Sequence, residues 1–176
     1  GQRDFSFYRK PSADMLYKPA YLDEITINQN DIMHFCSVDL VESEMKEAHR
    51  TMIEKFKAAE GTIVFDPNVR LPLWDSAEAC KQAIQEFIPK ANIIKVSDEE
   101  IEFITGEQDE QRAIQSLFQG SVEAVIYTQG AKGASIILKD GTSIHHDGFK
   151  VKAIDTTGAG DAFIGAAISR ILNSTT

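Results

Sequence analysis

One segment near the carboxyl end of the chain combines residue types that can bind an anion and move a proton. Residues 155–163 read Asp-Thr-Thr-Gly-Ala-Gly-Asp-Ala-Phe and lead into an apolar stretch. Gly158 and Gly160 allow the backbone to approach an anion closely, and a helix that begins there would offer free N–H groups and a partial positive charge. Asp161 would then lie in the first helical turn, where its carboxylate can act as a base toward a hydroxyl. The alternative interpretation is a tight turn with an aspartate that complements the helix dipole.

Two other phosphate-binding patterns are absent from the sequence. There is no G-x-x-x-x-G-K-[ST], which excludes a P-loop. In the pattern G-x-G-x-x-G the third glycine would fall at Phe163, and too few residues follow for the acidic ribose-binding position. A nicotinamide-binding domain is therefore a weak alternative. Phosphoryl transfer, which needs mainly positioning and charge stabilisation, fits the segment better.

The elements that must position this segment follow a regular alternation of strand and helix. Apolar, β-branched runs predict strands buried on both faces at residues 32–36, 62–65, 92–96 and 124–127. Helical periodicity predicts helices at 45–59, with Gly61 as the C-terminal cap, and at 76–88, where Pro89 is the stop. A period of about 30 residues is typical of repeated βαβ units, which form a parallel sheet with right-handed crossovers.

The pattern changes after residue 128. Residues 134–138 and 142–146 flank Lys139-Asp140-Gly141 and predict a β-hairpin. The last helix, from about Gly160 to Leu172, is apolar all round and is predicted to be buried. We expect one α/β domain over residues 1–176, a Rossmann-like three-layer sandwich with a mostly parallel central sheet.

Polar clusters follow three of the predicted strands, at residues 66–70, 97–100 and 128–133. Ligands of open parallel sheets bind outside the carboxyl ends of the strands, so we expect these clusters to converge at one edge. Each cluster also has a purely structural interpretation. The first is a good turn sequence, the second has the S-x-x-E spacing of a capping box, and the third contains turn glycines.

Composition excludes several classes of protein. The chain has 176 residues, 43% of them hydrophobic, which excludes intrinsic disorder. Its net charge of −9 argues against nucleic-acid binding but leaves room for a nucleotide substrate held by backbone N–H groups. No apolar run approaches the roughly 20 residues of a membrane span. Cys36 and Cys80 are too few for a disulfide framework, so we expect a cytoplasmic, reducing location.

Several segments together resemble one enzyme family. Residues 155–163 closely resemble the second signature of the ribokinase/PfkB carbohydrate kinases. Residues 65–70 with Leu73-Trp74 are similar to the corresponding stretch of fructokinases and 2-keto-3-deoxygluconate kinases, and residues 7–9 with 12–14 resemble the strand and turn before it. The resemblance implies a ribokinase-like fold and ATP-dependent phosphorylation of a sugar hydroxyl. Fructose is the expected substrate and 2-keto-3-deoxygluconate the alternative.

The resemblance also implies roles for individual residues. Asp161 would be the catalytic base, next to the bound sugar. The N–H groups of Gly158, Ala159 and Gly160 would form the anion hole for the transferred phosphoryl group.

Other implied contacts concern the nucleotide and its metal. Glu100 matches the N-x-x-E motif of the family, in which Ser97 replaces the asparagine. The motif implies that these two residues place Mg²⁺, here through water, and the ATP phosphates. Thr128, Gly130 and Gly133 match the nucleotide-binding turn.

Four further residues complete the implied site. Arg9 and Arg70 would face substrate or phosphate, because a guanidinium suits anionic oxygens. Asp155 and Thr157 match positions where relatives bind a monovalent cation, which suggests K⁺.

The family extends beyond this segment at both ends. The resemblance therefore implies a chain truncated at both ends, the nucleotide-side part of a larger kinase without its N-terminal sugar-binding and lid portion. The strand predicted from Phe5 fits such a cut. A homodimeric parent is compatible with the family, whose lid often pairs. An alternative of another class is a non-catalytic nucleotide- or anion-binding domain, because Asp161 has nothing to deprotonate without a positioned hydroxyl.

Overall fold

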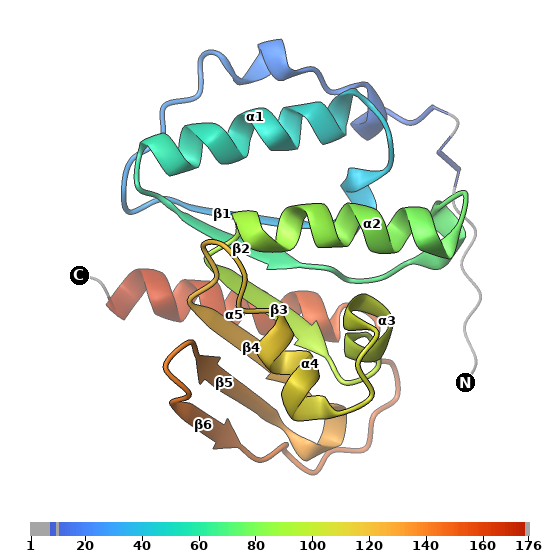
Figure 1. Cartoon of the computed structure of the whole chain (residues 1–176), viewed down its shortest axis with the longest axis vertical. Helices are drawn as coiled ribbons and strands as arrows, with labels where there is room; N and C mark the ends of the chain where they lie inside the picture. Colours follow the sequence, from blue (N-terminus) through green and yellow to red (C-terminus); the bar gives the residue numbers. More distant parts are fainter. Residues whose placement is uncertain (1–7, 10, 175–176) are drawn as a thin grey trace.

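The computed structural model describes residues 8–9 and 11–174, which form one α/β unit (Figure 1). The strands are β1 (Ile32–Cys36), β2 (Thr62–Asp66), β3 (Ile93–Ser97), β4 (Ala124–Thr128), β5 (Ala134–Leu138) and β6 (Ser143–His146). The helices are α1 (Glu44–Ala58), α2 (Ala77–Phe87), α3 (Ile101–Thr105), α4 (Glu110–Ser116) and α5 (Ala159–Ser174). The strand expected from Phe5 falls in the part of the chain that is not described.

The strands form one sheet in the order β1-β2-β3-β4-β5-β6. Strands β1 to β4 are parallel, whereas β5 and β6 are antiparallel to their neighbours. Because successive parallel strands are neighbours and their crossovers share one hand, α1 to α4 lie on the same face. α5 crosses the opposite face, which gives three layers (Figure 1). The predicted α/β class with a mostly parallel sheet is confirmed.

Alternate side chains of the central strands pack into the two helical layers. Phe35 and Phe65 stack beneath α1 and α2 with ring centroids 4.7 Å apart, and Phe87 of α2 meets Phe35 edge-on. On the other face Val64 packs with Ile164 of α5. Each such buried side chain contributes about 1.5–3 kcal/mol from removal of apolar surface from water. The core therefore fixes the strands, and with them the position of the strand ends.

The end of α1 differs from the prediction. The residue in the left-handed conformation is Glu60, at φ 57°, and not Gly61. The Glu60 N–H donates to the Lys57 carbonyl at 3.2 Å and the Gly61 N–H donates to the Phe56 carbonyl at 2.9 Å, which is a Schellman cap. Gly61 is needed for space, because a Cβ there would stand 2.8 Å from the Phe56 ring.

Helices α2 and α4 begin at side-chain caps. Ser76 Oγ accepts from the Ala79 N–H at 3.1 Å at the start of α2, and the helix gives way to a 3-10 turn at Ile88–Lys90, as Pro89 predicts. The seven-residue α4 is not predicted by the apolar pattern. It is capped by Asp109, whose carboxylate accepts from the Arg112 N–H.

The predicted hairpin is confirmed. β5 and β6 pair in antiparallel register around a turn in which Gly141 has φ 90°. The Leu138 N–H donates to the Thr142 carbonyl, and the Asp140 carboxylate accepts from the Thr142 N–H, both at 2.8 Å.

The prediction that the last helix is buried is wrong for the described chain. In α5 only Ile164 is fully buried, with Ala167 and Ile168 packed beside it. Phe163 and Leu172 are 38% and 40% exposed. The helix is apolar all round, but the sheet covers one of its sides, and no described element covers the other.

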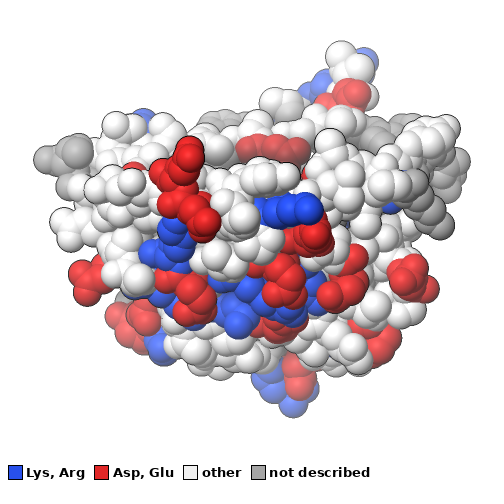
Figure 2. Space-filling view, turned by 90° about the horizontal axis from the view of Figure 1, so that it is seen from above, with Lys and Arg blue, Asp and Glu red and all other residues white. Residues whose placement is uncertain are grey.

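Charges on the face above α1 alternate in sign. Figure 2 shows lysine and arginine side chains interleaved with aspartate and glutamate side chains over this face. Many are paired along or across the helices, such as Arg50 with Glu86 and Lys57 with Glu54. None of the described helices is both long and apolar enough to cross a bilayer.

Candidate functional site

The ends of the parallel strands bring the polar clusters together, as the sequence predicts. Cys36 and Asp66, the last residues of β1 and β2, are register partners, and so are Ser97 and Thr128 at the ends of β3 and β4. α5 begins at Ala159 on the same edge of the sheet (Figure 1). The carboxyl edge of the sheet is therefore the place where the polar clusters that follow β2, β3 and β4 meet the start of α5.

The loop before α5 presents unused backbone donors. Gly158 has φ 75°, which requires glycine, and a Cβ there would meet no atom within 4 Å, so the loop faces open space. The N–H groups of Gly158 and Gly160 have no acceptor among the described residues. The Ala159 N–H, expected to join them, donates to the Thr156 carbonyl at 3.2 Å. The Asp155 carboxylate accepts from the Thr157 N–H at 2.7 Å and closes the start of the loop.

Asp161 lies in the first turn of α5 and is exposed. Its charge acts on His34 in the middle of β1 and on Cys36 and Asp66 at the ends of β1 and β2. An exposed carboxylate beside two free N–H groups at a helix start is well placed to take a proton from a hydroxyl that attacks a bound phosphoryl group.

Glu100 ties the end of β3 to the turn after β2. Its carboxylate accepts from the Ser97 hydroxyl at 2.7 Å and from the Val69 N–H at 2.7 Å. Asn68, at φ 44°, turns the chain before Val69. Ser97 does not accept from the helix as in a capping box. Its hydroxyl donates to the Glu100 carboxylate and thereby helps to hold that carboxylate in place at the edge.

The turn after β4 has one glycine with a structural role and one without. A Cβ on Gly133 would stand 2.0 Å from the His146 carbonyl oxygen, so glycine is required for the backbone contact with β6. Gly130 has φ 53° and a Cβ there would meet nothing within 4 Å. The Thr128 carbonyl accepts from the Asp98 N–H at 2.9 Å, which joins this turn to the one after β3. Gly130 is thus the member of the turn that faces open space.

A buried ion pair lies beneath the loop. The sequence pattern does not predict this pair. Lys95 on β3 and Asp66 on β2 are 6% and 2% exposed, and their N···O distances are 3.0 and 3.2 Å. The register that pairs Phe65 with Ile94 places them side by side. A lysine inside an otherwise apolar run was the only signal in the sequence.

The environment shifts the pKa values of groups at this edge. Burial raises the pKa of Asp66 to about 6, although the Lys95 ammonium opposes the shift. Burial also raises the pKa of the Cys36 thiol to about 11, which keeps it protonated. Desolvation, helped by the Lys95 charge, lowers the pKa of His34, while Asp161 acts against this shift. The pKa values of Asp66 and His34 therefore depend on burial and on the charges of Lys95 and Asp161.

The two predicted arginines lie in different places. Arg70 is exposed, donates to the Val69 carbonyl at 2.9 Å, and has no carboxylate partner among the described residues. Arg9 pairs with Asp14 and Asp39 and donates to the Val38 carbonyl.

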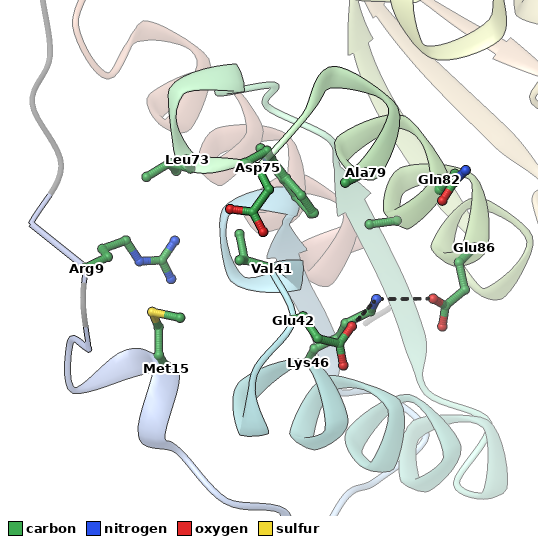
Figure 3. A pocket seen from close by; sticks show the side chains of 12 residues that line it. Arg9, Met15, Val41, Glu42, Lys46, Leu73, Asp75, Ala79, Gln82 and Glu86 are labelled. Carbon is green, nitrogen blue, oxygen red and sulfur yellow. Dashed lines mark hydrogen bonds and ion pairs between the residues drawn. The ribbon is translucent and has the colours of Figure 1, made fainter.

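Arg9 also lines a separate cavity. This cavity of about 480 Å³ lies between α1 and α2, where Lys46 bridges Glu42 and Glu86 (Figure 3). The structure therefore does not bring Arg9 into the lining of the glycine loop, whereas Arg70 follows the turn that Glu100 anchors.

The described residues contain no group of three or more His, Cys, Asp or Glu side chains arranged to hold a metal. Mg²⁺ commonly keeps several waters and binds through one or two carboxylates together with substrate phosphates. The carboxylate of Glu100, hydrogen-bonded on both oxygens, fits that mode of binding and not an all-protein cage.

Known proteins are similar to this chain in sequence and in fold. Fructokinase-2 of Solanum lycopersicum is 42% identical over 180 residues, which is 100% of this chain and 54% of that protein. A crystal structure of the Vibrio cholerae fructokinase with fructose, ADP and calcium ion has a TM-score of 0.84 and 31% identity, over 93% of this chain and 52% of that one. Aminoimidazole riboside kinase of Salmonella enterica, solved with aminoimidazole riboside and an ATP analog, has a TM-score of 0.82 and 30% identity over 92% and 53%.

The chain thus spans about half the length of these relatives. The sequence pattern described as pfkB family carbohydrate kinase matches residues 1–176, the whole of the chain. With the fold and the carboxyl-edge site, this match identifies the chain as a member of the pfkB family of carbohydrate kinases.

Proposed function

We propose that the protein carrying this chain transfers the γ-phosphoryl group of ATP to a hydroxyl of a ketohexose, fructose in the first place. The observation that carries the proposal is the loop before α5. It offers the free N–H groups of Gly158 and Gly160 next to the exposed carboxylate of Asp161, at the positive end of a 16-residue helix. The relatives named above include a fructokinase solved with fructose and ADP.

In this reaction Asp161 takes the proton of the sugar hydroxyl as the hydroxyl oxygen attacks the γ-phosphorus. The bond from the γ-phosphorus to the bridging oxygen breaks, and ADP leaves with the electron pair. The N–H groups of Gly158 and Gly160 donate to the oxygens of the transferred group, where negative charge must be stabilised in the transition state. Reorientation of the loop would add the Ala159 N–H, because its bond to Thr156 is long.

The remaining edge residues would hold the nucleotide and its cations. Glu100, steadied by Ser97, would bind Mg²⁺ through water, and Mg²⁺ supplies charge neutralisation for the phosphates. The open Gly130 would face the nucleotide with Thr128 and Gly133 behind it.

A monovalent cation, K⁺, would bind near the start of the loop. Asp155 and Thr157 already form a compact turn there, and a variant of the Vibrio cholerae fructokinase has been solved with a potassium ion. Arg70 would face the anionic oxygens of the phosphates or the substrate.

The rival substrate within the family is 2-keto-3-deoxygluconate, whose carboxylate would use Arg70. The test is ADP formation from ATP by the protein that carries this chain, with each sugar in turn at equal concentration. We expect fructose to give the higher kcat/KM, and Arg70→Gln to lower kcat/KM for fructose by no more than it lowers kcat/KM for the keto acid. A higher kcat/KM for the keto acid, lost in Arg70→Gln, would reverse the substrate assignment.

A second candidate function concerns the 176-residue chain by itself. One side of α5 is uncovered and Asp161 is exposed, so no described residue positions a sugar beside it. The chain alone would then be a non-catalytic domain that binds nucleotide or another anion. Phosphorylation of fructose by the purified 176-residue chain would rule this candidate out.

A further inference from the structure

The Lys95–Asp66 pair occupies an unusual position for two charges. Lys95 lies in the centre of a parallel sheet with 6% of its surface exposed, and Asp66 is still more buried. Breaking such a pair is strongly destabilising, yet a hydrophobic pair of similar volume is often as stable, so a buried ion pair is weak evidence of a role in stability alone. Its surroundings suggest what else it does.

The Lys95 ammonium lies directly beneath the start of α5. A Cβ added to Gly160 would stand 3.6 Å from Nζ, and outside Gly160, its two chain neighbours and the backbone of its own helix no other described atom lies within 4 Å of that point. No side chain from another element therefore lies between the ammonium and Gly160 in the first helical turn. The positive end of the helix dipole and a buried positive charge face each other across an ordinary contact distance.

The hydrogen bonds of Lys95 are incomplete. A lysine ammonium has three N–H donors, and those of Lys95 reach the two Asp66 oxygens at 3.0 and 3.2 Å. No further acceptor is found among the described residues. One donor of an ammonium that is more than nine-tenths buried is thus left without an acceptor among the described residues, and a buried unpaired donor is costly unless a ligand satisfies it.

Two positive fields at one point favour a negative charge between them. Asp66 supplies a negative charge from within the sheet. On the other side, the loop opens into free space. An anion held at the loop would lie in the combined field of the helix terminus and the ammonium. Charge-assisted interactions of this kind are stronger in a site shielded from water than at an exposed surface.

We propose that Lys95 is an electrostatic positioning residue of the phosphoryl site, where its buried ammonium adds positive charge to the anion bound by Gly158 and Gly160. Asp66 moderates this charge, so that removal of the Asp66 carboxylate strengthens anion binding while removal of the ammonium weakens it. The inference rests on the proposed function, because it concerns the same loop.

The test is binding of inorganic pyrophosphate to the 176-residue chain at neutral pH, measured by calorimetry and by the amide chemical shifts of Gly158 and Gly160. Relative to the wild type, we expect Lys95→Met to bind about tenfold more weakly. We expect Asp66→Asn to bind severalfold more tightly. The double variant Lys95→Met/Asp66→Asn keeps the sheet free of an unpaired buried charge and is expected to bind weakly, like Lys95→Met.

Lys57→Met is the matched control, because it removes one lysine charge at the end of α1. It should leave pyrophosphate affinity unchanged within twofold, and unfolding by urea monitors the stability of every variant. A merely structural pair predicts that both single variants lose affinity in step with stability, and that result would overturn the proposal. Pyrophosphate binding that is equal in the wild type and the double variant would overturn it while leaving the proposed function intact. No binding by any form, with unperturbed amide shifts, would contradict both.

Discussion

At the scale of single residues, the site is a set of charges held at different depths. Asp161 is exposed and free to meet a substrate, whereas Asp66 and Lys95 are enclosed by the sheet. Glu100 stands between these extremes, with its oxygens held by Ser97 and Val69. The exposed group suits proton transfer and the enclosed groups suit a fixed field, because buried charges are less screened by solvent.

The raised pKa of Asp66 predicts a dependence of stability on pH. Its carboxyl has a pKa of about 6 in the folded protein against 3.8 as the reference value, so folding favours the protonated form. This contribution is fully present below pH 3.8 and is lost as the pH rises through 6. We expect the free energy of unfolding of the wild type, relative to Asp66→Asn, to fall by up to about 3 kcal/mol between pH 4 and pH 7.

Urea unfolding of both proteins at several pH values measures that difference. A difference between the two proteins that does not change between pH 4 and pH 7 would show that Asp66 titrates as it does in the unfolded chain.

Residue-level prediction from the sequence succeeds where the chemistry is local. The order of residues in 155–161 alone indicates a turn, free N–H groups and a helix start, and the structure has all three. Lys95 and His34 are hidden inside apolar runs, because which face a strand residue occupies, and what lies across from it, depends on the register with other strands. The pairing of Arg9 with Asp39, 30 residues away in sequence, has no local signal either.

At the scale of elements, strand ends and helix ends set the geometry of the edge. α5 aims its N-terminus at the ends of β1 to β4, and the turns after β2, β3 and β4 are joined by Glu100 and by the bond from Asp98 to Thr128. Where the residue that caps a helix is strained, a substitution there can raise the free energy of unfolding without changing the site.

Glu60 offers such a change. A non-glycine residue at φ 57° carries a steric cost of roughly 1–2 kcal/mol, part of which glycine removes. We expect Glu60→Gly to raise the free energy of unfolding by about 0.5–1 kcal/mol, measured by urea or thermal unfolding.

Gly106 supplies the opposite case, because it caps α3 at φ 78° and is already glycine. Gly106→Ala should destabilise the chain by a similar amount. If Glu60→Gly lowered stability instead, the left-handed cap at Glu60 would be contradicted.

Elements with a repeating pattern are predicted well, and isolated ones are not. The four parallel strands and helices α1 and α2 show a period that local sequence fixes. The seven-residue α4 is too short to show a period. The burial of α5 is predicted wrongly, because the burial of an apolar helix depends on which elements pack around it.

At the scale of the whole molecule, helices pack on both faces of the sheet and the site opens at its carboxyl edge (Figure 1). A ligand that binds only the folded chain raises its stability by mass action. ADP at a hundred times its dissociation constant should add about 2.7 kcal/mol to the free energy of unfolding. Fructose alone should leave the melting temperature of the 176-residue chain unchanged, since no described residue encloses a sugar beside Asp161. A rise in the melting temperature with fructose alone would contradict the expectation that the 176-residue chain binds nucleotide but not sugar.

The most direct test of the proposed reaction is the turnover of Asp161→Asn in the protein that carries this chain, with ATP and fructose. Loss of a general base lowers the rate by about 10²–10⁴-fold, and the exposed position of Asp161 means that the variant should fold and bind ADP as the wild type does. We predict a fall in kcat of that size with the dissociation constant of ADP unchanged within about threefold. Wild-type turnover by Asp161→Asn would contradict the assignment of Asp161 as the base.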